Sequence, residues 1–97
     1  MKILPEPIIF EWDKGNLEKN WVKHKVNQQE IEEVFSNEHI LVFEDIQHSE
    51  KELRFQALGQ TVTGRRLFLS LTIRIEKIRV ISARDMNKKE EVIYEKV

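Results

Sequence analysis

The sequence predicts an α+β domain in which two N-terminal helices pack on a mostly antiparallel β-sheet, followed by a C-terminal helix. In residues 13–36, apolar side chains recur every three or four positions after residue types that commonly cap helices. Residues 40–84 instead contain short β-prone runs in which apolar and polar residues alternate. Because short connections join these runs, neighbouring strands are expected to pair antiparallel, with the helix pair covering their apolar face.

The N-terminal segment is expected to form a short strand and then the first helix. Residues 8–12, IIFEW, are apolar and rich in β-prone types. Asp13 follows as an N-cap for a helix that continues to about Lys25. The apolar and aromatic positions at helical spacing are Leu17, Trp21 and His24. We expect both tryptophans of the chain to be packing residues.

The second helix is expected to begin soon after the first ends. Asn27 is its N-cap, and Glu30, three residues later, completes a capping box. Its apolar stripe consists of Ile31, Val34 and Phe35. Lys23 and His24 therefore stand at the end of the first helix, where the partial negative charge of a helix C-terminus favours cations. A purely structural role for this pair is thus available beside a functional one.

Four strands are expected to follow the helices. They cover residues 40–45, 53–59, 65–75 and 78–84. The third strand alternates most regularly, and its apolar face consists of Leu67, Leu69, Leu71, Ile73 and Ile75. Glu76 and Lys77 leave a two-residue connection that predicts a hairpin, although neither is a favoured residue type for such a turn. Residues 48–52 form a polar loop, which Asp45 and His48 are expected to order.

Residues 85–97 are expected to form the C-terminal helix, capped by Asp85 or Asn87, with Val92 and Ile93 as its apolar contacts. A chain of 97 residues supports a single core, so residues 1–97 are expected to form one domain.

The composition is that of a compact soluble protein, with 40% hydrophobic and 34% charged residues. The absence of cysteine excludes disulfides, thiolate zinc sites and cysteine nucleophiles. The apolar run at the N-terminus is too short and too interrupted for a signal peptide, and no stretch approaches the length of a membrane span. A cytoplasmic protein without membrane association is therefore expected.

The net charge of −1 conceals an asymmetry between the two halves of the chain. Residues 1–50 carry 5 Lys and no Arg against 11 acidic residues, whereas residues 51–97 carry 11 Lys and Arg against 6 acidic residues. All of the arginines lie in the second half. A basic surface could exist despite a sequence pI near 6.3, which permits an anionic partner.

No metal or cofactor is expected. The three histidines lie in separate segments without a zinc-binding pattern, the three glycines are isolated, and the serines lack a nucleophile-elbow motif. What remains is a largely cationic set of candidate residues. It consists of Lys23, His24, Arg54, Arg79 and Arg84, with Glu90 and Tyr94 spaced i, i+4 on the C-terminal helix.

Motifs spread along the chain carry a resemblance to a known family. They are FEWD at residues 10–13, N-x-x-K-H ending at His24, Val34-Phe35, D-x-x-H-S-x-x-E-x-R from Asp45 to Arg54, Gly59, and ISAR at residues 81–84 followed by Glu90 and Tyr94. In this order, from about Ile8 to Glu95, the chain resembles the BrnT-type toxins, whose fold is similar to that of RelE-like ribonucleases. The resemblance implies a metal-independent ribonuclease toxin of a type II toxin–antitoxin system that cleaves mRNA.

The resemblance also implies roles for individual residues. Cleavage of RNA without a metal requires a base for the 2′-hydroxyl, cations for the developing phosphoryl charge and a proton for the leaving 5′-oxygen. The residues expected to be catalytic are Lys23, His24, Arg54, Arg84 and Tyr94, and those expected to bind substrate are Arg79 and Glu90. Arg54 and Arg84 suit bidentate phosphate binding, and His24 suits proton exchange. Tyr94 would transfer a proton or stack on a base.

The same resemblance implies a small cognate antitoxin as protein partner, and contact with operator DNA only through that antitoxin. The assemblies compatible with it are a homodimer and a heterotetramer with the antitoxin.

Two positions depart from the family pattern. Lys25 stands where the family usually has a glycine that ends helix one in a left-handed conformation, so the helix is expected to end differently. Asp85 places an acid beside Arg84. If these changes distort the cationic site, the alternative is a catalytically silent member that serves as the antitoxin's partner in an autorepressor complex.

Overall fold

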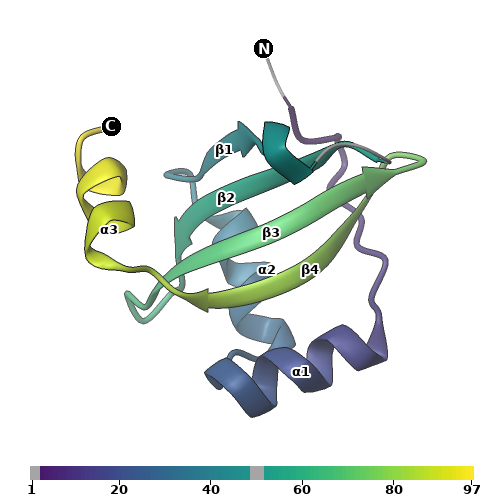
Figure 1. Ribbon diagram of the computed structural model, residues 1–97, viewed down its shortest axis with the longest axis horizontal. Coiled ribbons are helices and arrows are strands. Elements are labelled where there is room, and N and C mark those ends of the chain that lie inside the picture. Colours follow the sequence, from purple (N-terminus) through teal and green to yellow (C-terminus); the bar gives the residue numbers. More distant parts are fainter. Residues whose placement is uncertain (1–2, 49–51) are drawn as a thin grey trace.

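The computed structural model of the chain describes residues 3–48 and 52–97, and the order of its elements confirms the predicted α+β class (Figure 1). The helices are α1 (Lys14–His24), α2 (Gln28–Ser36) and α3 (Lys88–Glu95), and a short 3-10 turn is η1 (Ile46–His48). The strands are β1 (Leu41–Glu44), β2 (Arg54–Gln60), β3 (Arg66–Arg74) and β4 (Lys77–Asp85).

The strands form one sheet in the order β1-β2-β3-β4, and each neighbouring pair is antiparallel. Side chains alternate between its two faces. One face carries the apolar row predicted on the third strand, except for Ile75, which lies beyond β3 in the turn. The fully buried residues of this row are Leu67, Leu69 and Leu71. Ala57, Val80 and Ala83 on the flanking strands belong to the same core cluster. The alternation predicted from the sequence therefore determines which face is buried.

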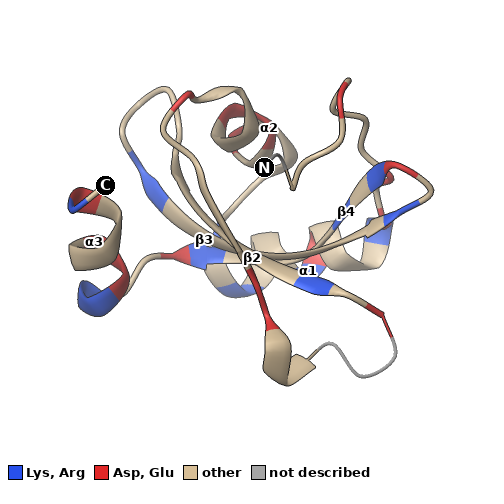
Figure 2. Ribbon diagram, turned by 90° about the horizontal axis from the view of Figure 1, so that it is seen from above, with Lys and Arg blue, Asp and Glu red and all other residues tan. Residues whose placement is uncertain are grey.

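Helix α2 covers this apolar face (Figures 1 and 2). The predicted capping box is present: the side chain of Asn27 accepts a hydrogen bond from the Glu30 amide at 2.9 Å, and Glu30 accepts one from the Asn27 amide at 3.0 Å. The buried residues of the helix are Ile31, Val34 and Phe35, as predicted. A Cβ added to Gly59 would lie 2.5 Å from Cγ1 of Val34. Helix and sheet can approach this closely because β2 has no side chain at that position.

Helix α1 packs against β4, at the margin of the sheet (Figure 1). Its N-cap is Asp13, as predicted, whose carboxylate accepts a hydrogen bond from the Asn16 amide at 3.0 Å. Asn20 is buried, and its side-chain oxygen accepts a hydrogen bond from the Ala83 amide at 3.1 Å. This bond satisfies a backbone donor of the edge strand and fixes the helix to it.

The end of α1 differs from expectation. Lys25 follows the helix with φ 55° and ψ 39°, the left-handed conformation for which glycine is usual. Its amide donates to the carbonyls of Asn20 and Trp21. Lys25 therefore ends the helix in the way a glycine would, and the expected change in the helix end is not observed. The lysine side chain makes this conformation costlier, by about 1 kcal/mol.

The predicted N-terminal strand does not form. Within the described residues of this segment, pairing is limited to a parallel bridge between Phe10 and Ile78, supported by a hydrogen bond from the Ile78 amide to the Ile9 carbonyl at 2.8 Å. Pro7 lacks an amide donor and cannot extend the pairing toward the N-terminus. Helix α1 begins shortly after the bridge, so the segment has no room to extend in the other direction.

The two tryptophans have different environments. Trp12 packs against the core as predicted, and its ring stacks on Phe10 with centroids 4.8 Å apart. Trp21 is 49% exposed, so the prediction that it is a packing residue is wrong. The amine of Lys25 lies 5.2 Å from the centre of the Trp21 ring. Helix α1 meets β4 through the side that carries Asn20, which turns the next residue outward.

Helix α3 is capped by Asn87, one of the two predicted caps, in a second capping box with Glu90. This start directs Tyr94 inward, where it is 2% exposed. The prediction that Val92 and Ile93 are the apolar contacts of the helix holds in part: Val92 is 51% exposed, whereas Ile93 is 40% exposed and lines a cavity between the helix and the sheet. Because the N-cap of the helix is Asn87, the residue of α3 that faces the protein interior is Tyr94.

The predicted β3–β4 hairpin is present, but its turn lies one residue earlier than expected. Arg74 pairs with Lys77, which leaves Ile75 and Glu76 as the loop. Both have positive φ, 48° and 62°, as a type I′ turn requires. Ile75 is 93% exposed, so no packing compensates the strain of a β-branched residue in this conformation.

The strain in the hairpin predicts that the paired substitution Ile75→Asn and Glu76→Gly stabilises the fold by about 1–2 kcal/mol, because both new residues tolerate positive φ. The free energy of unfolding in urea measures this change. Val62→Asn is the matched control, since Val62 is also exposed and β-branched but lies outside the positive-φ residues. A hairpin variant no more stable than the original protein would contradict the assigned strain.

Candidate functional site

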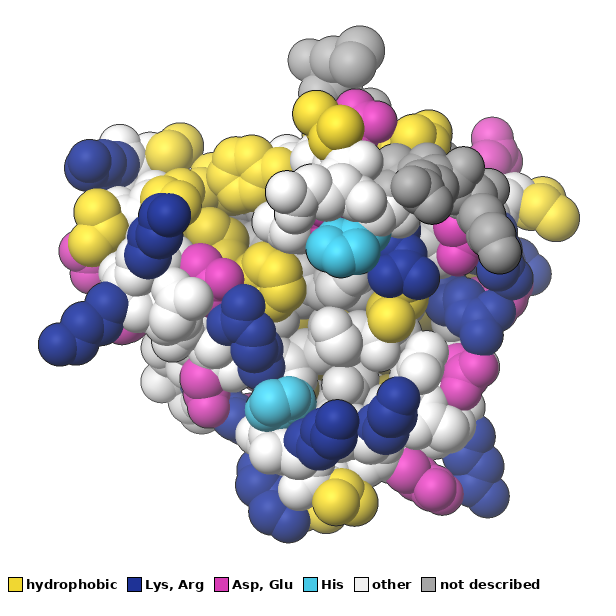
Figure 3. Space-filling model, viewed as in Figure 1, with side chains coloured by type: hydrophobic (Ala, Val, Ile, Leu, Met, Phe, Trp, Pro, Cys, Tyr) yellow, Lys and Arg dark blue, Asp and Glu magenta, His cyan; other side chains and the backbone are white. Residues whose placement is uncertain are grey.

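The face of the sheet opposite α2 is mainly polar. The strand register arranges its side chains in rows across the sheet, and we call three of these rows the open face. The rows are Asp45, Arg54, Thr72 and Arg79; Phe43, Gln56, Ser70 and Ser82; and Leu41, Leu58, Phe68 and Arg84. Asp45 belongs to the first row because its amide donates to the Arg54 carbonyl at 2.8 Å, one residue beyond β1. Figure 3 looks onto this face and shows basic side chains around a central uncharged polar area.

Three of the predicted site residues share the open face. Arg54 and Arg79 lie in one row, on either side of Thr72, so their backbones are separated by two strand spacings, about 10 Å. Arg84 lies two rows along, about 13 Å in the strand direction. Side chains as long as arginine can reach a common polyanion from these positions. These three arginines were selected from the sequence as candidate site residues. The sequence did not reveal that the pairing of the strands places all three on one face.

Arg84 is held in a defined orientation. Its Nη1 and Nη2 donate to the two carboxylate oxygens of Glu90, each at 2.8 Å, and its guanidinium lies 4.1 Å from the centre of the Phe68 ring. Burial raises the pKa of Glu90, but hydrogen bonds from Arg84 and from the Asn87 amide outweigh it and hold that pKa below its usual value. The two predicted residues therefore form a charged bidentate pair.

Arg79 is also paired. Its Nη2 donates to Asp13 at 2.7 Å, and its Nη1 lies 3.8 Å from a carboxylate oxygen of Glu11. The Asn16 amide and then Arg79 lower the pKa of Asp13 below its usual value, against the opposing effect of burial. Arg79 thus links β4 to the start of α1 as well as lying on the open face.

Tyr94 lies on the buried side of α3, and its surroundings favour packing over proton transfer. Its hydroxyl donates to the His39 carbonyl at 2.6 Å, and its ring stacks on the His39 ring with centroids 4.0 Å apart. Burial raises the pKa of the Tyr94 hydroxyl above its usual value, with a smaller opposing effect from Arg66. A buried hydroxyl with its proton engaged is poorly suited to acid–base chemistry near neutral pH.

An aspartate–histidine pair, expected to order the loop, lies on the open face. Nδ1 of His48 is 2.9 Å from Oδ2 of Asp45. The turn η1 stands on the opposite side of the sheet from α2 (Figure 2). In the sequence, the D-x-x-H spacing was the signal for this pair. The 3-10 turn is needed to show that the His48 ring lies against the Asp45 carboxylate.

A cavity of about 220 Å³ lies between the open face and α3. Its lining residues are Phe43, Gln56, Leu58, Phe68, Glu90 and Ile93. The two phenylalanines supply flat apolar surface, and the amide of Gln56 can both donate and accept hydrogen bonds. The sequence does not show that these phenylalanines lie close together, because Phe43 is on β1 and Phe68 is on β3.

No helix in residues 3–48 and 52–97 is long and apolar enough to cross a membrane. Within the same residues, no group of three or more His, Asp or Glu side chains is arranged to hold a metal ion.

Residues 12–90 match the protein family described as "Ribonuclease toxin, BrnT, of type II toxin-antitoxin system". The chain belongs to the BrnT family of ribonuclease toxins. The match confirms the resemblance inferred from the motifs. A search of curated proteins found no match. The fold is similar to the 1.1 Å crystal structure of the Brucella abortus ribonuclease toxin BrnT, with a TM-score of 0.61 and 20% sequence identity over 84% of this chain and 99% of that chain.

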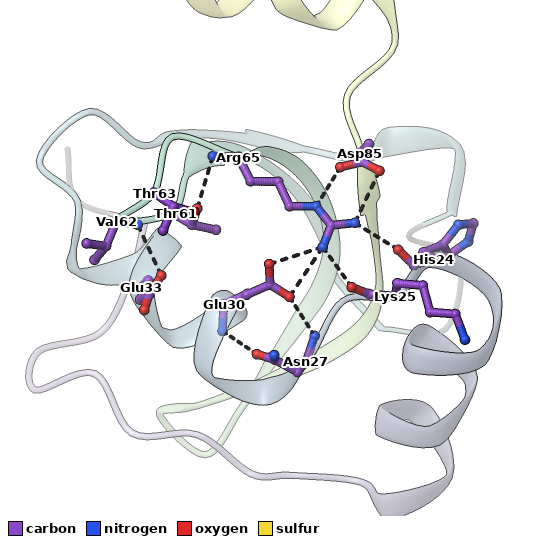
Figure 4. A network of polar contacts seen from close by, with 10 residues as sticks. All are labelled: His24, Lys25, Asn27, Glu30, Glu33, Thr61, Val62, Thr63, Arg65 and Asp85. Atoms are coloured by element: carbon purple, nitrogen blue, oxygen red, sulfur yellow. Dashed lines mark hydrogen bonds and ion pairs between the residues drawn. The ribbon is translucent and has the colours of Figure 1, made fainter.

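Lys23 and His24 of this BrnT-family chain lie at the β4 margin rather than within the rows of the open face. Lys23 is exposed and His24 is partly buried. The carbonyl of His24 accepts a hydrogen bond from Nη2 of Arg65 at 2.8 Å, while its ring points away from that arginine (Figure 4). The end of α1 is therefore fixed through its backbone, and the His24 ring does not take part in the contact.

Arg65 connects four acceptors near this helix end (Figure 4). Its Nε donates to Asp85 at 2.7 Å, and its Nη1 donates to the Lys25 carbonyl at 2.7 Å and to Glu30 at 3.1 Å. With the His24 carbonyl, these bonds join the α1–α2 connection to the ends of β3 and β4. Asp85, which was expected to place an acid beside Arg84, pairs with Arg65 through its carboxylate and meets Arg84 only through its carbonyl oxygen.

Because a lysine cannot reproduce this fork of hydrogen bonds, Arg65→Lys is expected to lower the free energy of unfolding by about 2–3 kcal/mol. Chemical denaturation measures the loss. Arg66→Lys is the matched control: the neighbouring arginine forms ion pairs with Glu91 and Glu95 on the surface, where a pair contributes about 0–1 kcal/mol. Equal losses in the two variants would show that Arg65 has no special structural role.

The pair between Arg65 and Asp85 also predicts a pH dependence. The hydrogen bond from Arg65 lowers the pKa of Asp85 below its usual 3.8, despite partial burial. A carboxylate with a depressed folded-state pKa stabilises the fold fully above its unfolded pKa and loses that effect as the pH falls through the folded value. Asp85→Asn should therefore cost a few tenths to about 1 kcal/mol at pH 7 and progressively less below about pH 4. Unfolding curves from pH 7 to pH 2 would contradict this if the cost stayed constant.

Proposed function

We propose that this chain is a metal-independent endoribonuclease toxin that cleaves mRNA and is neutralised by a small cognate antitoxin protein. Membership of the BrnT family supports a ribonuclease of a toxin–antitoxin system. The observation that carries the proposal is the placement of Arg54, Arg79 and Arg84 on one open face of the sheet. Cytoplasmic action follows from an mRNA substrate.

The open face supports the electrostatic part of RNA cleavage. The transition state concentrates negative charge on the phosphoryl oxygens, and fixed cations stabilise that charge without reorganisation. Arg84 already has its orientation set by Phe68 and Glu90. Of its five N–H groups, three donate to described residues, one to the Asp85 carbonyl and two to Glu90. Its remaining N–H groups are those through which it would contact a phosphate, given the donor inventory of arginine.

The remaining candidates have different roles in this proposal. Arg54 and Arg79 bind phosphate from the first row, while Lys23 and His24 extend the basic surface at the β4 margin. The cavity beside Phe43 and Phe68 receives a base, because aromatic side chains stack on nucleobases with little sequence preference. Glu90 orients Arg84, and Tyr94 anchors α3 rather than transferring a proton.

The antitoxin is proposed to cover the toxin and to make the only contact of the complex with operator DNA, in a heterotetramer. A catalytically silent member, serving as the antitoxin's partner in an autorepressor complex, is the alternative. The ion pairs of Arg79 with Asp13 and of Arg84 with Glu90 favour it, because RNA must compete with these carboxylates.

Purified protein should cleave single-stranded RNA in the presence of EDTA. Arg54→Ala and Arg84→Ala should each lower kcat/KM about tenfold or more, equivalent to about 1.4 kcal/mol of transition-state stabilisation. Lys23→Ala and His24→Ala should lower it to a similar extent, with melting temperatures nearly unchanged. Lys96→Ala is the control, since it removes one positive charge from an exposed residue outside the open face.

Expression in cells separates the two functions. Alone, the active toxin should arrest growth and fragment mRNA, and co-expression with the protein encoded beside it should restore growth. The ribonuclease function would be rejected if growth stayed normal and RNA stayed intact at confirmed soluble expression. If the protein still bound its neighbouring protein, that result would favour the catalytically silent member.

A further inference from the structure

The aspartate–histidine pair of the open face has no part in the function proposed above. Nδ1 of His48 lies 2.9 Å from Oδ2 of Asp45 and 3.2 Å from Oδ1. The 3-10 turn creates this contact, because the His48 amide donates to the Asp45 carbonyl at 3.3 Å and returns the ring over the carboxylate. We infer that His48 is the general base of RNA cleavage and that Asp45 positions its imidazole. The inference rests on the proposed ribonuclease function.

The hydrogen bonds assign the tautomer of His48. Burial raises the pKa of Asp45, but hydrogen bonds from His48 and Gln56 outweigh it and hold that pKa below its usual value. Asp45 is therefore ionised at neutral pH, and an ionised carboxylate can only accept hydrogen bonds. Nδ1 of His48 must carry the proton that it donates. In the neutral ring, Nε2 then presents its lone pair, which is the state a base requires.

His48 combines a fixed ring with access to solvent. Its side chain is 61% exposed, whereas Asp45 is 9% exposed. The other two histidines differ, and all three lie within the described residues. The His39 ring stacks on Tyr94, and Nε2 of His39 is buried. The His24 ring forms no hydrogen bond with a carboxylate in the described part of the chain. His48 is thus the histidine whose ring is both oriented by an acid and open to a substrate.

Arg54, a candidate for phosphate binding, lies opposite Asp45 at the start of β2. The Asp45 amide donates to the Arg54 carbonyl at 2.8 Å, so the two residues face one another on adjacent chain segments. Directly opposed residues of an antiparallel pair have Cβ atoms about 4.5–5.5 Å apart. Since the His48 ring is hydrogen-bonded to Asp45, we place the phosphate bound by Arg54 on the same side of the sheet as that ring. The arrangement brings the base and a cation to the same phosphodiester.

The proposed step is balanced in atoms and charge. Nε2 of His48 accepts the proton of the ribose 2′-hydroxyl as the 2′-oxygen forms a bond to phosphorus. The bond from phosphorus to the 5′-oxygen breaks, which yields a 2′,3′-cyclic phosphate. The leaving 5′-oxygen takes a proton from solvent water, and the imidazolium returns its proton to the hydroxide that remains. Asp45 stabilises the imidazolium during the step, as an aspartate does in a catalytic triad.

The first test compares two variants of the same turn with RNA containing one scissile 2′-hydroxyl. His48→Ala should lower kcat by about a hundredfold or more, the usual contribution of a general base. Gln47→Ala should stay within about twofold, because Gln47 is an exposed neighbour in η1 and has no acid–base group. Both variants should bind the 2′-deoxy analogue as tightly as the original protein, since the base acts in the chemical step.

Chemical rescue distinguishes a base from a residue that orders the loop. Added imidazole should restore part of the cleavage by His48→Ala and none of that lost in Arg54→Ala. Asp45→Asn should lower kcat about tenfold or more. In the His48→Ala background the same change should have little further effect, because a positioning residue acts only through the ring it orients. Additive losses without imidazole rescue would assign the pair to loop order and overturn the inference.

The outcomes separate this inference from the function on which it rests. If the original protein cleaves RNA and His48→Ala cleaves at the same rate, the inference fails and the ribonuclease proposal stands. If the original protein binds RNA without cleaving it, the ribonuclease proposal fails and the inference fails with it. A cyclic phosphate product with rescuable loss in His48→Ala supports both.

Discussion

The arrangement of the helices on the sheet depends on the guanidinium of Arg65. Its bonds to the carbonyls of His24 and Lys25 supply cationic donors to a helix end whose carbonyls lack intrahelical partners. Its bonds to Glu30 and Asp85 tie the start of α2 and the end of β4 to the same point. Because Asp85 and Glu30 raise the pKa of Arg65 against the effect of partial burial, the charge persists at every pH at which the protein folds. Arg65 thus fixes α1 at the β4 margin.

This constraint leaves one face of the sheet for chemistry. Helix α2 covers the apolar face, while other elements meet the polar rows at their ends: Asp13 pairs with Arg79, His48 with Asp45, and Glu90 with Arg84. The charge asymmetry of the sequence has a related explanation. Acidic residues of the first half pair with arginines of the second, as in Glu30 with Arg65 and Asp13 with Arg79. Part of the basic surface that the sequence suggested is therefore neutralised within the molecule, and Arg79 shows that this includes an arginine of the open face.

Local signals predicted most of the fold. The caps at Asp13 and Asn27 and the apolar alternation of β3 are encoded within a few residues, so the sequence alone could place those elements. Errors arose where a distant contact or a backbone conformation decided the outcome. The hairpin turn shifted onto Ile75 because strand register outweighed the unfavourable φ of that residue. The candidate arginines could be selected by type, but pairing between strands was needed to show which of them share a face.

In the proposed function, the acidic partners of the open-face arginines would have opposing effects on RNA binding. Glu90 orients Arg84, so the arginine side chain would lose less conformational entropy when a phosphate binds to it. The same carboxylate competes with the phosphate, so affinity for RNA is reduced while the geometry of the bound state is improved. Asp45 differs, since its charge is directed at His48. The charge of Asp45 would repel the phosphate of bound RNA. Once His48 accepts the 2′-proton, the positive charge of its imidazolium would offset the charge of Asp45. In the proposed mechanism, such a pair would stabilise the transition state more than the bound RNA, which is the condition for a gain in kcat.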